Sequence, residues 1–245
     1  CSGHEAAQLA AATNLNSGKD WIYPYYREAA LCLGLGMTGK EQLLSFLARG
    51  DDPNSGGRQM PQHYGHKDLR IVSQSSPTGT QFLQAVGSAM SRKWENTKEI
   101  VYVSSGEGST SEGEFHEALN WSSREKLPVI FHIQDNEYAI SVHISEQTSG
   151  ASVHSMVAGY QNLSRFDVDG TNFFETDLAF KQAVDRARKG KGPSVIVSHV
   201  VRLLPHSSSD DQRKYRTNKD LELDKNRDPI ILFEKYCIKE KAASK

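Results

Sequence analysis

The residues best suited to chemistry stand in the stretch GEGS, Gly106 to Ser109, directly after the apolar run IVYVSS. Glycines let the backbone approach a ligand closely, and the first amides of the helix that follows attract phosphate oxygens, so Gly106, Gly108 and Ser109 are candidate cofactor-binding residues. Glu107 would repel a bare phosphate, so its presence indicates a divalent cation between the two, with Mg²⁺ the usual choice. The spacing matches neither the dinucleotide fingerprint nor the P-loop. A lone Gly-x-Gly is more often only a tight turn, so this prediction needs a second set of ligands.

That second set follows the next apolar run along the chain. Asp135 and Asn136 stand just beyond the run PVIFHIQ. If the two runs are neighbouring parallel strands, their carboxyl ends meet and Asn136 lies beside Glu107. Glu107, Asn136 and a backbone carbonyl near Tyr138 would then supply three oxygens to one octahedral ion, and diphosphate oxygens and a water would complete it.

The elements that must position these residues alternate along the chain. Apolar, β-branched runs predict strands at about 99–105, 128–134 and 193–200. Helical patterns cover about 4–13, 26–36, 39–49, 79–94, 111–125, 173–189 and 229–242. Thr38 with Glu41, and Ser111 with Glu114, have the capping-box spacing of helix starts. This alternation predicts an α/β fold with a parallel sheet and helices on both faces, in three layers.

Two polar stretches interrupt that pattern. Residues 51–77 are rich in glycine, proline, serine and histidine, and residues 205–228 are polar and charged. Both are predicted to be loops, the first too long to be a mere connection. His116 and His132 fall on a helical and a strand pattern, where a hydrogen-bonded core histidine is the simpler interpretation.

Bulk composition limits the class of protein. The 245 residues fit one domain, 1–245, and 29 basic against 30 acidic side chains do not predict a nucleic-acid partner. The three cysteines, Cys1, Cys32 and Cys237, lack the spacing of a disulfide framework or zinc site, so we expect a reducing, cytoplasmic location. No run is long and apolar enough to predict a membrane span. Since the chain starts without methionine, we expect a trimmed amino terminus, and we interpret KEKAASK as a cut carboxyl end as well.

Seven blocks in order resemble the alpha subunit of the thiamine-diphosphate-dependent 2-oxo acid dehydrogenases, especially the branched-chain type. They are YYREAAL, GRQMPQHYGHK, SSPTGTQ, GEGSTSEGEFHEALN, LPVIF, NEYAIS and PHSSSDD. The resemblance implies the three-layer thiamine-diphosphate-binding fold, in which Glu107, Asn136 and the Tyr138 carbonyl hold Mg²⁺. It also implies that Tyr26 and Arg27 bind the diphosphate.

The same resemblance assigns further residues. Ser76 and Thr78 would sit near the aminopyrimidine of the cofactor. A potassium ion would take its ligands from the loop SSPTGTQ, namely Ser75, Pro77, Thr80 and Gln81. His206 is similar to the active-site histidine of the family, which orients substrate and assists acyl transfer, and His63 is a second candidate to line the pocket.

The implied activity is oxidative decarboxylation of a small 2-oxo acid, with a branched-chain substrate favoured over pyruvate, and acyl transfer to a lipoyl group on an acyltransferase. The family completes its active site with a beta subunit or a fused beta half, so this chain alone is expected to be inactive. A noncatalytic scaffold subunit and a transketolase-like half are the alternatives; the blocks YYRE, SSP and PHSSSDD argue against the second.

The chain also departs from the family pattern beside the expected metal. Asp135 replaces the first of two asparagines, Gln134 stands at a basic or neutral position, and Glu137 replaces a glycine. The added negative character costs on the order of 1 kcal/mol when screened. Cofactor binding is therefore expected to persist.

Overall fold

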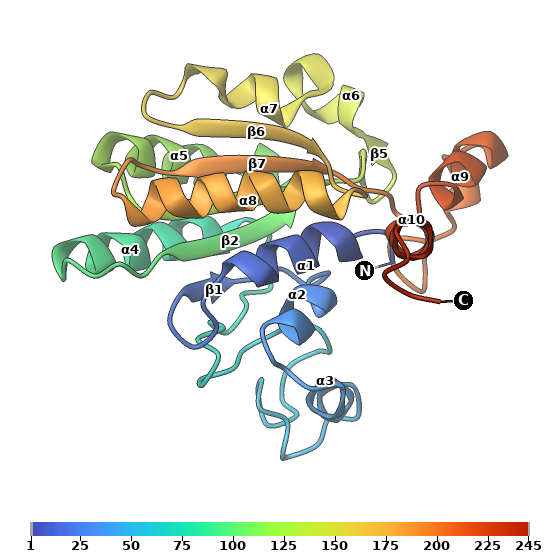
Figure 1. Ribbon diagram of the computed structural model, residues 1–245, viewed down its shortest axis with the longest axis horizontal. Helices are drawn as coiled ribbons and strands as arrows, with labels where there is room; N and C mark the ends of the chain where they lie inside the picture. Colours follow the sequence, from blue (N-terminus) through green and yellow to red (C-terminus); the bar gives the residue numbers. More distant parts are fainter. Residues whose placement is uncertain (1, 245) are drawn as a thin grey trace.

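The computed structural model describes residues 2–244, and its centre is a sheet of five parallel strands (Figure 1). The strands lie side by side in the order β1, β2, β3, β7, β6. Their bounds are Trp21–Tyr23 for β1, Val101–Gly106 for β2, Val129–Asp135 for β3, Ser194–His199 for β7 and Ser164–Asp169 for β6. Because every neighbouring pair is parallel, all five carboxyl ends meet at one end of the sheet.

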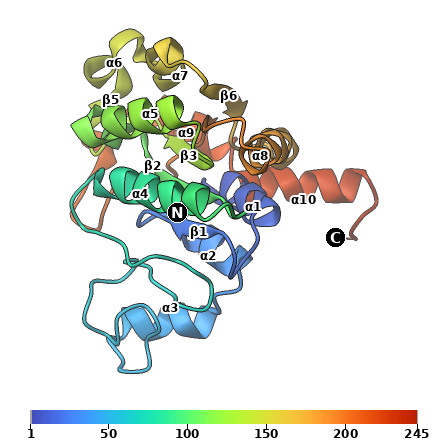
Figure 2. The same cartoon turned by 90° about the vertical axis from the view of Figure 1, so that its left-hand side faces the viewer.

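Helices cover both faces of this sheet and make the three layers (Figure 2). One face carries α1 (Glu5–Asn14), α2 (Ala29–Gly34) and α8 (Phe173–Arg188), and the other carries α4 (Thr80–Trp94) and α5 (Gly113–Glu125). Successive side chains of a strand point to opposite faces, so Ile130 joins the first core and Phe131 the second. Burial on both faces explains why the central strands are continuous apolar runs in the sequence.

Shorter elements extend from this body. They are α3 (Gly39–Phe46), the 3₁₀ turn η1 (Glu107–Ser111), β4 (Tyr138–Ala139), β5 (Val142–His143), α6 (Ile144–Gln147), η2 (Ser149–Ala151), α7 (Val153–Met156), η3 (Val157–Gly159), η4 (Gln212–Lys214), α9 (Asn218–Lys225) and α10 (Pro229–Lys239). The β4–β5 pair is an antiparallel hairpin that follows β3. The turn η1 and this hairpin together continue the chain beyond the ends of the two central strands.

Polar side chains cross one buried face of the sheet. The His132 ring lies between β2 and β7, with Nδ1 2.7 Å from the Tyr102 hydroxyl and Nε2 3.0 Å from Ser198 Oγ. Burial lowers the pKa of His132 to about 3, so the ring is neutral. The Gln134 amide donates to the Glu28 carboxyl, whose pKa burial raises to about 8. The prediction of a hydrogen-bonded core histidine at position 132 is confirmed.

The structure confirms the α/β class, the three predicted strands and most of the helices. The Thr38–Glu41 capping box is present, with Thr38 Oγ1 accepting from the Glu41 amide at 3.2 Å. Edge strands β1 and β6 are absent from the sequence-based prediction. Strand β1 is only three residues long, and β6 is interrupted by charged, solvent-facing Arg165 and Asp167.

Four local predictions are wrong. The helix expected at 26–36 begins only at Ala29, because the preceding residues form a turn. Ser111 does not cap α5: the N-cap is Glu112, and Ser111 ends η1, where its hydroxyl accepts from Gln147 Nε2 at 2.9 Å. The region 205–228 contains η4 and α9 instead of loop alone, since Thr217 and Asp220 form a capping box in the charged stretch. His116 is only half-buried on α5, 3.4 Å from the Tyr160 hydroxyl, so it is not a core residue.

Cys32 and Cys237 are free thiols, and Cys1 lies outside the described residues. Within residues 2–244, no helix has both the length and the apolar character to cross a membrane.

Candidate active site

A pocket of about 290 Å³ opens at the carboxyl ends of β2 and β3. We call it the carboxyl-end pocket. Its walls come from the segment after β1, the end of β2 with η1, the β4 hairpin, and the segment after β7. Ten sequence-predicted site residues line it: Tyr26, Arg27, Thr78, Gly106, Glu107, Gly108, Ser109, Asn136, Tyr138 and His206. The fold thus brings together residues that lie up to 180 positions apart in the chain.

Glu107 and Asn136 form the buried corner of this pocket. The Glu107 side chain is nearly inaccessible, and its Oε2 accepts a hydrogen bond from the Asn136 backbone amide at 3.2 Å. Burial, and secondarily the charge of Asp135, raise the pKa of Glu107 to about 7. A carboxylate held in so unfavourable a setting gains from a cation. The register of β2 and β3, with Gly106 opposite Gln134, creates this proximity.

The donors present fit a magnesium ion. Asn136 Oδ1 is buried and has no hydrogen-bond partner among residues 2–244, so an oxygen lone pair is left for a ligand. The Tyr138 carbonyl accepts a long 3.4 Å hydrogen bond from Arg202, whose shorter bond of 2.9 Å goes to the Ile140 carbonyl. Carboxylate, amide and carbonyl oxygens are the ligand types that Mg²⁺ prefers. Among residues 2–244, no group of three or more His, Cys, Asp and Glu side chains is placed to hold a metal, so a site here would depend on this mixed set.

Gly108 and Ser109 shape the turn that carries Glu107. A Cβ added at Gly108 would lie 2.7 Å from the Ala139 Cβ, so only glycine permits η1 to pack against β4. Ser109 Oγ donates to the Gly106 carbonyl at 2.8 Å and also contacts Ser105 Oγ. The Ser109 hydroxyl is therefore used within the turn, and its side chain braces the corner.

Arg27 and His206 meet on the opposite wall. Arg27 Nη2 lies 3.1 Å from His206 Nδ1 and donates to the His206 carbonyl at 3.2 Å, while its guanidinium lies 5.0 Å from the centre of the Tyr26 ring. Burial and the neighbouring Arg27 charge lower the pKa of His206. Because Nδ1 accepts from arginine, the neutral ring carries its proton on Nε2. This wall therefore offers a cation and a neutral imidazole donor.

A hydrogen-bonded chain supports His206 from behind. Its backbone amide donates to Asp210 Oδ2 at 2.8 Å, and the Tyr215 hydroxyl donates to the same oxygen. Arg202 Nη2 in turn donates to the Tyr215 hydroxyl at 2.7 Å. The segment after β7 is therefore held to the β4 hairpin through the buried Arg202.

Two predicted pocket residues lie outside it. His63 and Ser76 do not line the carboxyl-end pocket; His63 Nε2 lies 2.8 Å from Ser76 Oγ, and the two loop residues bond each other. The structure thus does not bring His63 to the corner with Glu107.

The predicted potassium ligands surround the start of α4. Thr80 Oγ1 donates to the Pro77 carbonyl at 3.1 Å, and buried Gln81 donates from Nε2 to the Ser104 carbonyl at 3.2 Å. Ser75 is half-buried in the segment just before them. The side chains of Thr80 and Gln81 thus brace the loop and join α4 to β2.

Sequence reasoning missed Tyr25, Ser105, Ala139 and Ile140 as pocket residues, and Arg202 as their support. Tyr25 and Ser105 adjoin predicted residues, so adjacency was an available signal. Arg202 also left a signal, since a cation directly after the apolar run PSVIVSHV falls at the same end of the sheet as Glu107.

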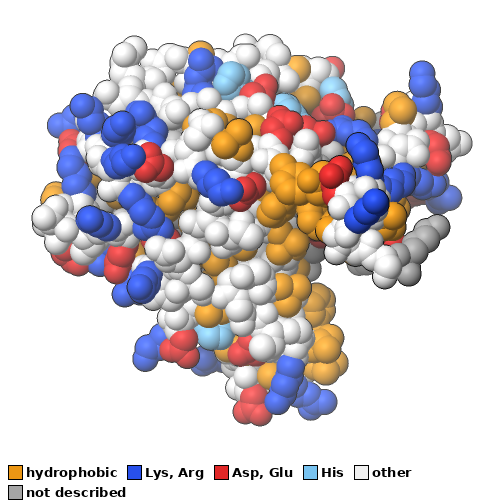
Figure 3. Space-filling model, viewed as in Figure 1, with side chains coloured by type: hydrophobic (Ala, Val, Ile, Leu, Met, Phe, Trp, Pro, Cys, Tyr) orange, Lys and Arg blue, Asp and Glu red, His pale blue; other side chains and the backbone are white. Residues whose placement is uncertain are grey.

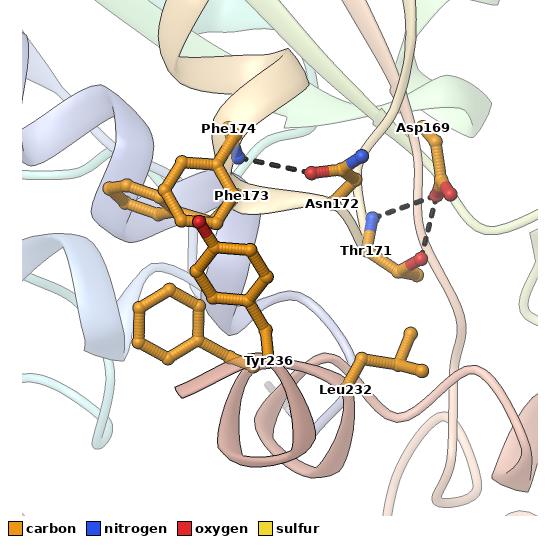
Figure 4. Close-up of a pocket in the computed structure, with 8 residues that line it drawn as sticks. Asp169, Thr171, Asn172, Phe173, Phe174, Leu232 and Tyr236 are labelled. Atoms are coloured by element: carbon orange, nitrogen blue, oxygen red, sulfur yellow. Dashed lines mark hydrogen bonds between the residues drawn. The ribbon is translucent and has the colours of Figure 1, made fainter. Parts of the chain in front are cut away.

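A second hollow of about 270 Å³ lies between the start of α8 and α10 (Figure 4). Four of its eight lining residues are aromatic, and Figure 3 shows hydrophobic side chains gathered on this side of the molecule. Its polar groups are used locally: Asn172 Oδ1 accepts from the Phe174 amide at 3.1 Å, and Asp169 accepts from Thr171. None of its lining residues is basic, and its one charged side chain is the Asp169 carboxylate, so this hollow does not fit an anionic diphosphate.

The fold and the carboxyl-end pocket define an α/β protein with a pocket beyond the carboxyl ends of a parallel sheet, where ligands bind in such folds. Comparison with known proteins agrees and is more specific. The family model described as dehydrogenase E1 component matches residues 1–245. The chain belongs to this family.

Named relatives refine the comparison. The chain is 42% identical to the 2-oxoisovalerate dehydrogenase subunit alpha of Bacillus subtilis over 236 residues, which cover 96% of this chain and 71% of that protein. It is 34% identical to the 3-methyl-2-oxobutanoate dehydrogenase subunit alpha of Mycobacterium tuberculosis, covering 96% of this chain and 61% of that one. The mitochondrial 2-oxoisovalerate dehydrogenase subunit alpha of Homo sapiens is 36% identical, with 97% and 53% covered. The resemblance to branched-chain alpha subunits is confirmed, and the chain spans little more than half the length of some of them.

Proposed function

We propose that this chain is the metal- and diphosphate-binding subunit of a thiamine-diphosphate-dependent 2-oxo acid dehydrogenase that acts on a branched-chain substrate. The observation that carries the proposal is the buried corner, where the Glu107 carboxylate adjoins an Asn136 oxygen with no partner. An acid buried beside an expected diphosphate is tolerable only if a cation joins them. The names of the relatives support the substrate class.

In this proposal Glu107, Asn136 and the Tyr138 carbonyl hold Mg²⁺. Arg27 pairs with the diphosphate, since guanidinium donors match phosphate oxygens, and Tyr26 packs against Arg27. Thiamine diphosphate, when bound, supplies the chemistry that cleaves the bond to the leaving carboxylate. Thr78, which lines the pocket, would lie near the organic part of the cofactor, whereas Ser76 bonds His63 outside the pocket.

His206 would orient the substrate. Its Nδ1 is committed to Arg27, so the Nε2 proton is left for a substrate oxygen. The Asp210–Tyr215–Arg202 chain fixes the backbone that carries it. Arg202 thereby couples the position of His206 to that of the Tyr138 and Ile140 carbonyls.

Partners complete the proposal. A beta subunit, or a fused beta half, would form the other wall of the carboxyl-end pocket, and a lipoyl-bearing acyltransferase would receive the acyl group. A potassium ion would further order the loop that contains Ser75, Pro77, Thr80 and Gln81. Neither a nucleic acid nor a membrane is part of the proposal, and a cytoplasmic location stays a prediction.

The test is decarboxylation by the chain assembled with its beta subunit, with 2-oxoisovalerate and pyruvate compared at equal concentration. We expect activity that depends on added Mg²⁺ and thiamine diphosphate, with the larger kcat/KM for 2-oxoisovalerate. A preference for pyruvate would reassign the substrate. No cofactor binding would refute the proposal and support a noncatalytic scaffold subunit that has lost its cofactor site. Cofactor binding without any decarboxylation would refute the proposed activity.

A further inference from the structure

A second acid lies directly behind the buried corner formed by Glu107 and Asn136, which we call the metal corner because it would bind the ion in the proposed function. Asp135 is buried at the end of β3, next in sequence to Asn136, and its charge contributes to the raised pKa of Glu107. Its Oδ1 accepts from the Glu137 amide at 2.9 Å, which shapes the turn into the β4 hairpin. The turn needs a stabilising hydrogen bond, because Glu137 has a positive φ of 67°, a conformation that favours glycine. Asp135 therefore shapes the turn that carries Asn136 and the Tyr138 carbonyl, but at the cost of a buried negative charge.

His199 lies on the far side of this acid. It ends β7, opposite Asp135 in the sheet register, and its Nδ1 is 3.3 Å from Asp135 Oδ2. Its Nε2 is 2.8 Å from Asp167 Oδ1 on β6, so one ring bridges carboxylates from both neighbouring strands. These hydrogen bonds raise the pKa of His199 to about 9, with Asp135 the largest contributor. Because ionised carboxylates only accept hydrogen bonds, a ring that bonds one through each nitrogen carries a proton on both and is cationic.

We propose that His199 is a positioning residue for the metal corner: its imidazolium neutralises Asp135 and keeps that carboxylate bonded to the Glu137 amide. The acidic residue in the Asp135–Asn136 pair then adds no net charge beside the diphosphate. The inference rests on the proposed function, because the corner concerned is the one that would bind the metal and cofactor.

Other charged groups nearby do not replace His199 in this role. Asp167 is exposed and contacts only the outer nitrogen of the ring. Arg227 contacts Asp169 at 3.4 Å and the His199 carbonyl at 3.5 Å, so its charge is directed to the outer edge of the sheet. Arg202 faces the β4 carbonyls and Tyr215. Among residues 2–244, His199 is the one cationic side chain that forms an ion pair with Asp135.

The experiment measures binding of thiamine diphosphate, at saturating Mg²⁺, by calorimetry on the chain assembled with its beta subunit. The variants are His199→Gln, Asp135→Asn, the double variant, and Asp167→Asn as a matched control that touches the same ring from the outer side. We expect His199→Gln to weaken binding about 5- to 10-fold, since an uncompensated charge near the corner then opposes the anionic cofactor. In the double variant we expect affinity within about 2-fold of the unaltered protein, and likewise for Asp167→Asn.

The outcomes are distinguishable. Unchanged binding in His199→Gln, or a double variant as weak as the single one, would overturn the role of His199 while the proposed function stands. If the unaltered complex binds no cofactor, the proposed function and this inference both fail. If His199→Gln does not fold, the test compares the Asp135→Asn variant with the double variant, which carries both Asp135→Asn and His199→Gln. Without the acid, removal of the histidine must change the affinity by less than about 3-fold, and a larger loss refutes the compensation.

Discussion

Replacement of Glu107 by glutamine should stabilise the ligand-free protein at alkaline pH while abolishing its response to magnesium and cofactor. The side chain is almost completely buried, and its pKa is raised to about 7 from the ordinary value of 4.5. An acid whose pKa is raised by folding stabilises the folded state fully only below its unfolded pKa. That contribution is lost as pH rises through the folded pKa.

The magnitude follows from linkage. A shift from 4.5 to about 7 corresponds to roughly 3 kcal/mol once both states are ionised. Part of this loss has already occurred at pH 5. The free energy of unfolding of Glu107→Gln, relative to that of the unaltered protein, should therefore be about 2 kcal/mol larger at pH 8 than at pH 5. Glutamine keeps the size and the hydrogen-bond acceptor toward the Asn136 amide, so packing changes little.

The assay is urea unfolding of both proteins at pH 5 and pH 8, without ligand and then with Mg²⁺ and thiamine diphosphate. The unaltered protein should be stabilised by ligand, by about 2.7 kcal/mol at a concentration 100 times the Kd, and the variant should not respond. Identical pH dependence in the two proteins would refute the burial argument. A ligand response preserved in the variant would refute the assignment of Glu107 to the metal.

Three further outcomes test separate parts of the site. Asn136→Ala should weaken Mg²⁺ binding about 10- to 100-fold yet change the free energy of unfolding by less than about 1 kcal/mol, because Asn136 Oδ1 has no partner among the described residues. Calorimetry measures the Mg²⁺ affinity, and urea unfolding measures the stability. A large loss of stability with unchanged Mg²⁺ affinity would contradict the ligand role. Gly108→Val should destabilise by about 1 to 3 kcal/mol through contact with Ala139, whereas Gly113→Ala, where nothing lies within 4 Å, should have little effect in the same unfolding assay. His206→Gln should lower kcat about 10- to 100-fold with cofactor Kd within about 3-fold, and an equal loss in both would assign His206 to cofactor binding instead.

The pairing of Glu107 with Asn136 could be predicted from sequence because it depends on one general property. Parallel strands that are neighbours in the sheet end together, and two apolar runs were enough to locate both ends. No comparable rule describes the loop that contains His63 and Ser76. Their mutual hydrogen bond, which draws His63 away from the pocket, depends on the path of an irregular segment.

The partners of Asp135 could not be found in the same way. Asp167 lies on β6, whose charged, alternating sequence does not predict a buried parallel strand. The sequence therefore could not predict the strand order that places His199 between two acids. Arg202 was overlooked for a related reason. A buried arginine is rare, and its place is explained only by the carbonyls of a hairpin that the sequence does not reveal.

The polar side chains inside the sheet have a consequence for how accurately the metal corner is aligned. If β3 slipped by one residue against β2, His132 would point toward the opposite, apolar core; the Ser198 hydroxyl would lose its partner, and the Tyr102 hydroxyl would keep only its bond to Glu28. A buried polar group left without a hydrogen-bond partner costs about 1 to 3 kcal/mol, and a slip of a uniformly apolar strand would carry no such cost. Residues outside the pocket therefore fix the register of the two strands, and they hold Glu107 and Asn136 close together in the proposed metal site.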